Sequence, residues 1–231
     1  MEFHFMTSHS NPITQKLTID IKWHPPQKGW YKLNVDGAHD NLKSGIGGVF
    51  RSWRGKWIIG FQKKTNAICP LHAELQSLQE GLKLAHRFML FPLEIETDSI
   101  DVIKAIENGH ATLNNVIFFS RSLMLQLKDL VLRHNFREGN RVADALAKDA
   151  KNEDDSKNMH EEVKVLVSPP VFVKKTLAND MSGDPIFSKN VSSSICNMLF
   201  CLGNQNIMKE GPSDPSLFAL SEEQCNMPNA A

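Results

Sequence analysis

The chain has 231 residues, 41% of them hydrophobic and 23% charged, and its 26 Lys and Arg balance its 26 Asp and Glu. This is the composition of an ordinary globular protein, with room for one well-packed domain and extensions. No apolar run approaches the ~20 residues that a membrane-spanning helix needs, and the N-terminal sequence MEFHFMTSHSNPITQ lacks the basic and apolar regions of a secretory signal. The four cysteines show no disulfide spacing, so we expect a soluble intracellular protein, cytoplasmic or nuclear.

Hydrophobic periodicity predicts α/β structure between residues 30 and 150. The predicted strands are 30–38, 44–53, 56–64, 93–98 and 131–136, and the predicted helices are 70–88, 99–109, 115–130 and 140–150. Arg54 and Gly55 form a predicted tight turn between the second and third strands. The order βββαβααβα predicts a mixed five-stranded sheet, three antiparallel strands followed by parallel ones, with helices packed on it.

The two ends of the chain differ in character from this central region. Residues 1–22 are polar and aperiodic and are expected to form a flexible arm, which leaves a folded domain at 23–151. Residues 20–151 hold 19 Lys and Arg against 14 Asp and Glu, a net charge of +5, whereas residues 152–231 hold 6 against 11, a net charge of −5. The Asn-, Ser- and Pro-rich segment 152–231 is expected to be a mostly disordered acidic tail. Within it, the apolar run 161–175 is a candidate strand and a candidate binding site for a partner protein.

Four carboxylates lie on elements that face the predicted core. Asp36 ends the first strand, Asp98 ends the fourth, Glu74 lies on or beside the buried stripe of its helix, and Asp144 lies between two alanines of the last helix. Taken singly, each is most simply a solvated strand end, a helix cap or a surface charge. If the first and fourth strands are neighbours, however, the four carboxylates can meet, and they would then repel one another unless they bind protons or cations.

Such a cluster of hard oxygen ligands suits Mg²⁺, with Mn²⁺ as an alternative. Two ions about 3.5–4 Å apart can activate a water molecule and stabilise the leaving oxygen in phosphodiester hydrolysis. Gly37 and Ala38 would then leave room for a nucleic-acid backbone next to the metals. A second predicted nucleic-acid surface is the hairpin with interleaved tryptophans, which carries the basic residues Arg51, Arg54 and Lys56. The alternative for this hairpin is a solvated edge whose charges keep it soluble.

The segments LNVDGA, HAELQSLQEGLKLA, EIETDS and HNFREGNRVADALAKDA resemble, in order, the motif blocks of the type-one ribonuclease H family. The resemblance covers residues 29–151 and is strongest to the reverse-transcriptase-like ribonuclease H domains of plants. It implies a ribonuclease H-like fold in which Asp36 bridges two metal ions, Asp144 completes one site, and Glu74 and Asp98 hold the other. It also implies that His134, in a flexible loop after the last strand, assists proton transfer or product release.

The resemblance implies a monomeric, metal-dependent endonuclease that cuts the RNA strand of RNA–DNA hybrids. Two features depart from the family pattern. Residues 109–130 hold only two basic residues, Arg121 and Lys128, so the basic handle of many relatives is missing. At the positions where relatives carry amide side chains that read the RNA 2′-hydroxyl, this sequence has Ile100 after Asp98-Ser99 and Pro70-Leu71 at the start of the helix. Two alternatives therefore stay open: a retroelement-derived nucleic-acid-binding module with little hydrolysis, and an interaction protein that recruits a partner through residues 161–175.

Overall fold

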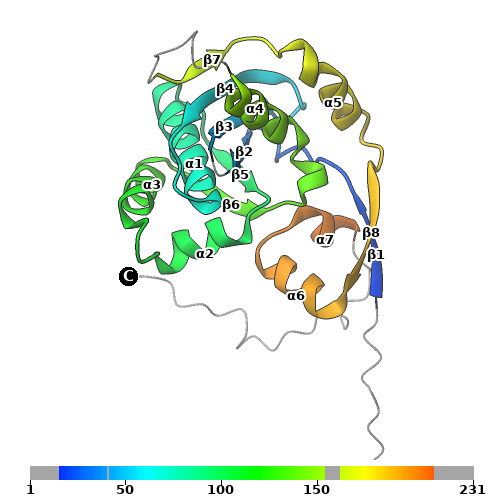
Figure 1. Ribbon diagram of the computed structural model, residues 1–231. Coiled ribbons are helices and arrows are strands. Elements are labelled where there is room, and N and C mark those ends of the chain that lie inside the picture. Colours follow the sequence, from blue (N-terminus) through cyan, green and yellow to red (C-terminus); the bar gives the residue numbers. More distant parts are fainter. Residues whose placement is uncertain (1–15, 41, 154–161, 211–231) are drawn as a thin grey trace, which may run out of the picture.

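A computed structural model describes residues 16–40, 42–153 and 162–210. One mixed sheet forms its centre (Figure 1). The strands of this sheet are β2 Tyr31–His39, β3 Ser44–Ser52, β4 Trp57–Thr65, β5 Leu93–Thr97, β6 Leu130–His134 and β7 Lys164–Leu166. In space they follow the order β6-β5-β2-β3-β4-β7. Strands β2, β3 and β4 are antiparallel, and β5 and β6 run parallel to β2. The predicted mixed α/β architecture is therefore confirmed, with a sixth strand added at one edge.

Helices cover both faces of the sheet. They are α1 Pro70–Arg87, α2 Ile100–Asn108, α3 Asn114–Gln126, α4 Arg141–Asn152, α5 Val171–Ser182, α6 Ser193–Cys201 and α7 Gln205–Glu210, with a short 3₁₀ turn, η1, at Arg137–Gly139. Helix α1 packs on the face that carries Leu33 and Val35, and α4 packs on the opposite face against Val49. Helix α5 in turn packs against α4.

The strict alternation of β2 and β5 gives the two faces different chemistry. On the α1 face, Leu33, Val35 and their β5 counterparts Leu93 and Ile95 form the centre of the hydrophobic core. On the α4 face the same strands present polar side chains, which are Lys32, Asn34, Glu94 and Glu96, all at most 3% exposed. A buried polar face needs partners, because an uncompensated buried charge is costly.

These side chains pair partly with one another, as in the ion pair of Lys32 with Glu94 at 2.6 Å, and the C-terminal segment adds a further partner. Strand β1, Lys16–Ile21, pairs with β8, Phe187–Ser192, in a separate two-stranded sheet. This small sheet packs with α6 and α7 around a second apolar cluster. From α7, Gln205 donates to both carboxylate oxygens of Glu94 at 2.9 and 3.0 Å.

The structure differs here from the expectation for the chain ends. Residues 16–21 form β1 rather than part of a flexible arm, and residues 162–210 form β7, α5, β8, α6 and α7 rather than a disordered tail. The candidate strand within 161–175 is present as β7, which pairs with β4. The remaining parts of those two expectations, at 1–15, 154–161 and 211–231, lie outside the described residues. Among the residues that are described, none of the helices has the length and apolarity to span a membrane.

Candidate metal centre

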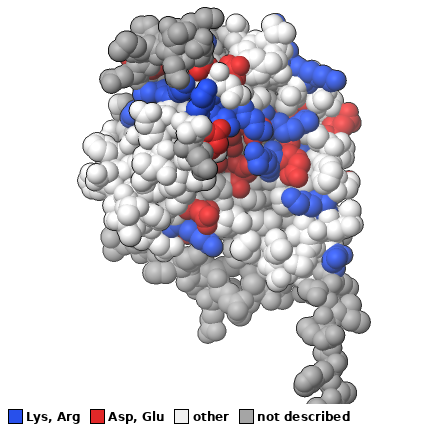
Figure 2. All heavy atoms as spheres, in the orientation of Figure 1, with Lys and Arg blue, Asp and Glu red and all other residues white. Residues whose placement is uncertain are grey.

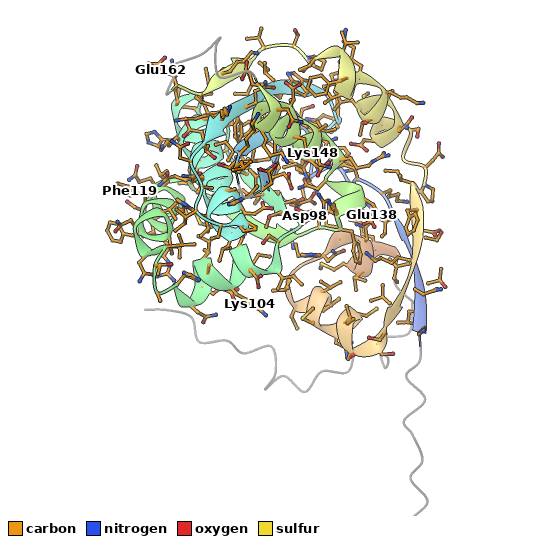
Figure 3. All side chains as sticks on the ribbon, viewed as in Figure 1. Asp98, Lys104, Phe119, Glu138, Lys148 and Glu162 are labelled. Atoms are coloured by element: carbon orange, nitrogen blue, oxygen red, sulfur yellow. The ribbon has the colours of Figure 1, made fainter. Side chains whose placement is uncertain are left out.

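Three of the four predicted carboxylates meet at one end of the sheet. Asp36 lies in β2, Asp98 directly follows β5, and Glu74 lies in the second turn of α1. Their ligand oxygens all lie within 4.8 Å of one another. This agrees with the predicted reason for the cluster, because neighbouring parallel strands bring their carboxyl ends to the same edge. Figure 3 labels Asp98, which directly follows the C-terminal end of β5.

Two glycines allow the helices to approach the strands closely enough to build this cluster. A Cβ on Gly37 would lie 2.4 Å from the Ala73 carbonyl carbon and from the Glu74 nitrogen. On the other face, a Cβ on Gly47 would lie 2.4 Å from the Ala147 nitrogen of α4. Gly37 is therefore required by the packing of α1 against β2, while the room that Gly37 and Ala38 would leave for a nucleic acid stays a prediction. Its N–H donates to Glu74 Oε2 at 3.1 Å and so orients that carboxylate.

The three carboxylates carry strongly perturbed pKa values. Burial raises the pKa of Asp36 to about 8, with smaller contributions from the charges of Asp98 and Asp144. Burial and the charges of Asp36 and Asp98 raise the pKa of Glu74 well above its ordinary value, against the opposing Gly37 hydrogen bond. Burial also raises the pKa of Asp98. Without a metal the cluster therefore holds protons near neutral pH, which a divalent cation would displace on binding.

The donor chemistry of the cluster fits a hard divalent cation. Every candidate ligand atom is a carboxylate oxygen, which is what Mg²⁺ and Mn²⁺ prefer. Beside the cluster, Asn140 is 1% exposed and donates through Nδ2 to the Val35 carbonyl at 2.8 Å and to Asp98 Oδ1 at 3.4 Å. Its Oδ1 has no hydrogen-bond partner among the described residues. The site thus combines crowded acidic groups with an unsatisfied buried acceptor, and a cation would relieve both.

Asp144 lies beside this group rather than within it. Its charge contributes to the raised pKa of Asp36, so the two carboxylates are close. Both of its oxygens are held by cations, Arg137 Nη2 at 3.0 Å and Lys148 Nζ at 2.6 Å. Figure 2 shows Lys and Arg side chains gathered over α4 with acidic side chains among them, and Figure 3 shows Lys148 on this helix. The fourth carboxylate is therefore adjacent to the cluster and ion-paired.

The position predicted for His134 is wrong. It is the last residue of β6, opposite Thr97, and it is 5% exposed rather than part of a flexible loop. The C-terminal segment covers it: the His134 N–H donates to the Leu202 carbonyl at 2.9 Å, and Asn204 Nδ2 lies 2.8 Å from His134 Nδ1. Burial lowers its pKa to about 4, opposed by a hydrogen bond with the Asp98 backbone.

The predicted nucleic-acid surface on the hairpin is also revised. Arg51 is 1% exposed, with Nη1 2.7 Å from Asp180 Oδ2 and its guanidinium 3.7 Å from the centre of the Trp23 ring. Arg51 is therefore a buried ion-pair partner that cannot contact phosphates. Arg54 and Lys56 are exposed, but they lie at the opposite end of the strands from Asp36. The hairpin turn follows Ser52, which pairs with Tyr31. Tyr31 lies five residues before Asp36 along β2, a distance of about 16 Å at 3.3 Å per residue.

Sequence reasoning missed three residues of this site. They are Gly47, Arg137 and Asn140. Gly47 lies in the run SGIGG, whose three glycines within one strand signal close backbone packing. Arg137 and Asn140 lie in the segment REGNRVAD, which carries part of the resemblance to the ribonuclease H family. Arg137 lowers the pKa of Asp36, Glu74 and Asp98 alike, so it is the positive charge shared by the whole cluster.

The mixed sheet, the helices on both faces, and the carboxylates in the C-terminal half of β2 and directly after β5 define a ribonuclease H-like protein. A sequence model of the family described as "Reverse transcriptase-like" matches residues 34–150, just over half of the chain. The chain belongs to this family. All three carboxylates of the cluster, together with Asp144, lie inside the matched region.

Individual relatives agree with this assignment. The chain is 35% identical over 134 residues to an Arabidopsis thaliana protein named "Putative ribonuclease H protein", a match that covers 55% of this chain and 21% of the relative. It therefore spans about a fifth of that curated relative. The structure of ribonuclease H1 from Halobacterium salinarum is similar, with a TM-score of 0.50, 26% identity and coverage of 53% of this chain and 97% of that one. The N-terminal ribonuclease H domain of Rv2228c from Mycobacterium tuberculosis has a TM-score of 0.50 at 20% identity, over 53% of this chain and 93% of that one, and shows the fold alone.

Proposed function

We propose that the protein is a metal-dependent endonuclease that hydrolyses the RNA strand of RNA–DNA hybrids. The observation that carries the proposal is the convergence of Asp36, Glu74 and Asp98 within 4.8 Å, in a family whose relatives include proteins named as ribonucleases H. Three clustered carboxylates, one buried and two partly buried, are hard to explain by a structural role, because burial and neighbouring carboxylate charges disfavour the ionised forms of Asp36 and Glu74. Buried charges that are costly to the fold are typical of catalytic sites.

Each residue of the centre has a definable task. Asp36 is the central ligand, because it interacts with both Asp98 and Asp144. Glu74 is held by the Gly37 N–H through one oxygen and can offer the other. Asn140 keeps Asp98 in place between β2 and α4. Two bound Mg²⁺ or Mn²⁺ ions would supply an activated water and neutralise charge on the scissile phosphate.

The basic side chains around Asp144 would bind the phosphates of the substrate. Arg137 and Lys148 reach the edge of the acidic cluster, and Lys151, further along α4, pairs with Asp40 at 2.9 Å. These cations can exchange their carboxylate partners for phosphate oxygens when a nucleic acid arrives, which would free Asp144 as a ligand. Arg54 and Lys56 would contact phosphates only beyond the catalytic end of the sheet. Binding is then expected to weaken with salt, because phosphate contacts release counterions.

One observation favours the alternative of a nucleic-acid-binding module with little hydrolysis. Both oxygens of Asp144 are occupied by cations, so one proposed ligand is engaged elsewhere. The third hypothesis is partner recruitment through residues 161–175. Part of this segment already packs within the protein, because β7 pairs with β4 and Val173 of α5 is fully buried, so less of it is available to a partner. Val171 and Phe172, at the start of α5, are still 82% and 47% exposed.

The deciding experiment is cleavage of a labelled RNA–DNA hybrid with Mg²⁺ and then with Mn²⁺, beside single-stranded RNA, duplex RNA and duplex DNA. The enzyme proposal expects cleavage of the RNA strand of the hybrid with either metal, and its loss in Asp36→Asn. Hybrid binding without cleavage under both metals would establish the binding module instead. Cleavage of duplex RNA at the same rate as the hybrid would support nuclease activity but contradict the proposed specificity for hybrids.

A further inference from the structure

A cavity of about 290 Å³ lies at the end of the sheet opposite the metal centre. Three segments line it: the chain before β2, the turn between β3 and β4, and the end of α5. The first and the last of these lie outside the matched family region, residues 34–150. Its lining includes Lys22, Trp23, His24, Trp53, Arg54 and Met181. The volume is close to the lower end of the range for ligand sites, so the cavity suits one small planar group.

The turn between β3 and β4 contributes an aromatic ring with a cation stacked on it. Trp53 is partly exposed, and the Arg54 guanidinium lies 4.5 Å from the centre of its ring. Indole rings and guanidinium groups both stack on nucleobases, largely irrespective of the base. The Trp23 ring is less suited to this role, because it is 2% exposed and carries the Arg51 guanidinium at 3.7 Å. Trp53 and Arg54 are therefore the platform that a planar ligand would contact.

The charges around the cavity favour an anionic ligand. Lys22 and Arg54 line it, and Lys56 is exposed in the same turn as Arg54. The acidic residue in the lining, Asp180, is already neutralised, because its Oδ2 lies 2.7 Å from Arg51 Nη1. A phosphate beside the planar group would therefore meet cations rather than an unpaired carboxylate.

A chain of amide hydrogen bonds fixes the tautomer of His24 in the cavity wall. Asn135 donates from Nδ2 to Glu96 Oε2 at 2.8 Å, so its Oδ1 accepts from Asn206 Nδ2 at 3.1 Å. The Asn206 oxygen consequently accepts the Lys22 N–H at 2.9 Å and lies 3.1 Å from His24 Nε2. An amide oxygen only accepts, so Nε2 has to carry a hydrogen.

His24 then has one acceptor atom left for a ligand. Burial lowers the pKa of His24 to about 4, with further contributions from the charges of Lys209 and Lys32, so the ring is neutral at pH 7. With the hydrogen on Nε2, Nδ1 is an acceptor, and it has no hydrogen-bond partner within the described part of the chain. The exocyclic amino groups of adenine, cytosine and guanine are donors that match such an acceptor.

We propose that this cavity binds an unpaired nucleotide of a nucleic acid strand, with the base against Trp53 and Arg54, its amino group toward His24, and its phosphate toward Lys22. The inference rests on the proposed function only for the kind of substrate that brings such a strand. Trp53 directly follows Ser52, whose partner Tyr31 lies about 16 Å from Asp36 along β2. This distance corresponds to about five base pairs of duplex at 3.4 Å each, so the cavity lies within reach of a single-stranded extension of a hybrid.

The test is binding of a labelled oligomer of about eight adenine deoxynucleotides, measured by fluorescence anisotropy with the full-length protein in EDTA. An abasic oligomer with the same number of phosphates is the comparison, because it keeps every electrostatic contact and lacks the bases. Wild type is expected to bind the adenine oligomer at least about tenfold more tightly. Trp53→Ala should lower this affinity roughly 5- to 100-fold, the range for loss of one base–aromatic stack, whereas Trp53→Phe should stay within about threefold of wild type.

Phe118→Ala is the matched control, since Phe118 is an aromatic residue of α3 that is 69% exposed and does not line the cavity. It should leave the affinity unchanged. Equal binding of the abasic oligomer would mean that the protein recognises phosphates alone and would overturn the proposal. A folded Trp53→Ala with wild-type affinity would overturn it as well. An oligomer of purine, which lacks the amino group of adenine, should bind more weakly, and equal affinity would contradict the role of His24.

A second variant decides the question if Trp53→Ala fails to fold. Met181 is 57% exposed near the end of α5, and Met181→Trp would fill the cavity from that side. We expect it to weaken binding of the adenine oligomer but not of the abasic one, and unchanged binding of both would refute the proposal. These measurements need neither metal nor cleavage. Absence of hybrid cleavage would therefore refute only the proposed function, and absence of base-dependent binding only this inference.

Discussion

Replacing Asp180 with alanine is expected to destabilise the protein by about 3 kcal/mol, because it leaves a buried arginine without its counter-charge. Asp180 lies in α5 and pairs with Arg51 of β3, 129 residues earlier in the chain. The two side chains are 3% and 1% exposed. The pair therefore joins the C-terminal segment to the central sheet.

The magnitude follows from what remains around Arg51 in the variant. Breaking a buried ion pair from one side typically costs about 3–5 kcal/mol. Arg51 would keep a 2.7 Å hydrogen bond from Nη2 to Asn34 and its stacking on the Trp23 ring. The charge of Glu96 also acts favourably on Arg51 from a greater distance. These residual interactions place the expected loss at the lower end of the range.

Urea denaturation at pH 7, followed by tryptophan fluorescence and by circular dichroism, measures this loss. Asp184→Ala is the matched control, since Asp184 is exposed just beyond the same helix and its removal should change stability by less than about 0.5 kcal/mol. The double variant Arg51→Met with Asp180→Leu should recover most of the stability, because apolar replacement of a buried ion pair is often neutral. A loss below about 1 kcal/mol in Asp180→Ala would refute the reasoning and mean that α5 does not hold the sheet through this pair.

Three further predictions concern the metal centre. Asp98→Asn should leave the metal-free melting temperature equal or higher, because Ser99 rather than Asp98 caps α2, while hybrid cleavage falls by at least about 100-fold; wild-type cleavage would place the chemistry elsewhere. Since burial raises the pKa of Asp36 to about 8, the folded metal-free protein binds an extra proton between pH 4 and 8, and its stability should fall as pH rises through this window, by up to about 1.4 kcal/mol per pH unit for each such proton. Asp36→Asn should flatten that slope in urea titrations, and an unchanged slope would assign it to other groups. Gly37→Ala should lower the free energy of unfolding by about 1–3 kcal/mol and reduce cleavage, because the new Cβ would clash with the main chain of α1. A variant with wild-type stability and activity would contradict this close packing.

The sequence by itself determined the central elements and the identity of the site residues. Alternation of apolar side chains in 31–39 and 93–97, and helical spacing from Pro70, are local patterns, so the strands and helices between residues 30 and 150 could be predicted within a few residues. The placement of Asp36 and Asp98 together followed from one further step, the parallel pairing of their strands. Glu74 could be predicted near them from its place beside a buried helical stripe.

Only the tertiary structure decided how the rest of the chain completes this centre. Helix α5 has no clear apolar face in sequence, and it becomes ordered through contacts of Val173 and Leu177 with Val49 and α4. The burial of Arg51 and of His134 likewise depends on Asp180 and Asn204, which lie 129 and 70 residues away along the chain. Such contacts cannot be predicted from local periodicity, because in the sequence each of these polar residues looks the same as one that is exposed to solvent. They form only when the C-terminal segment folds back onto the polar face of the sheet.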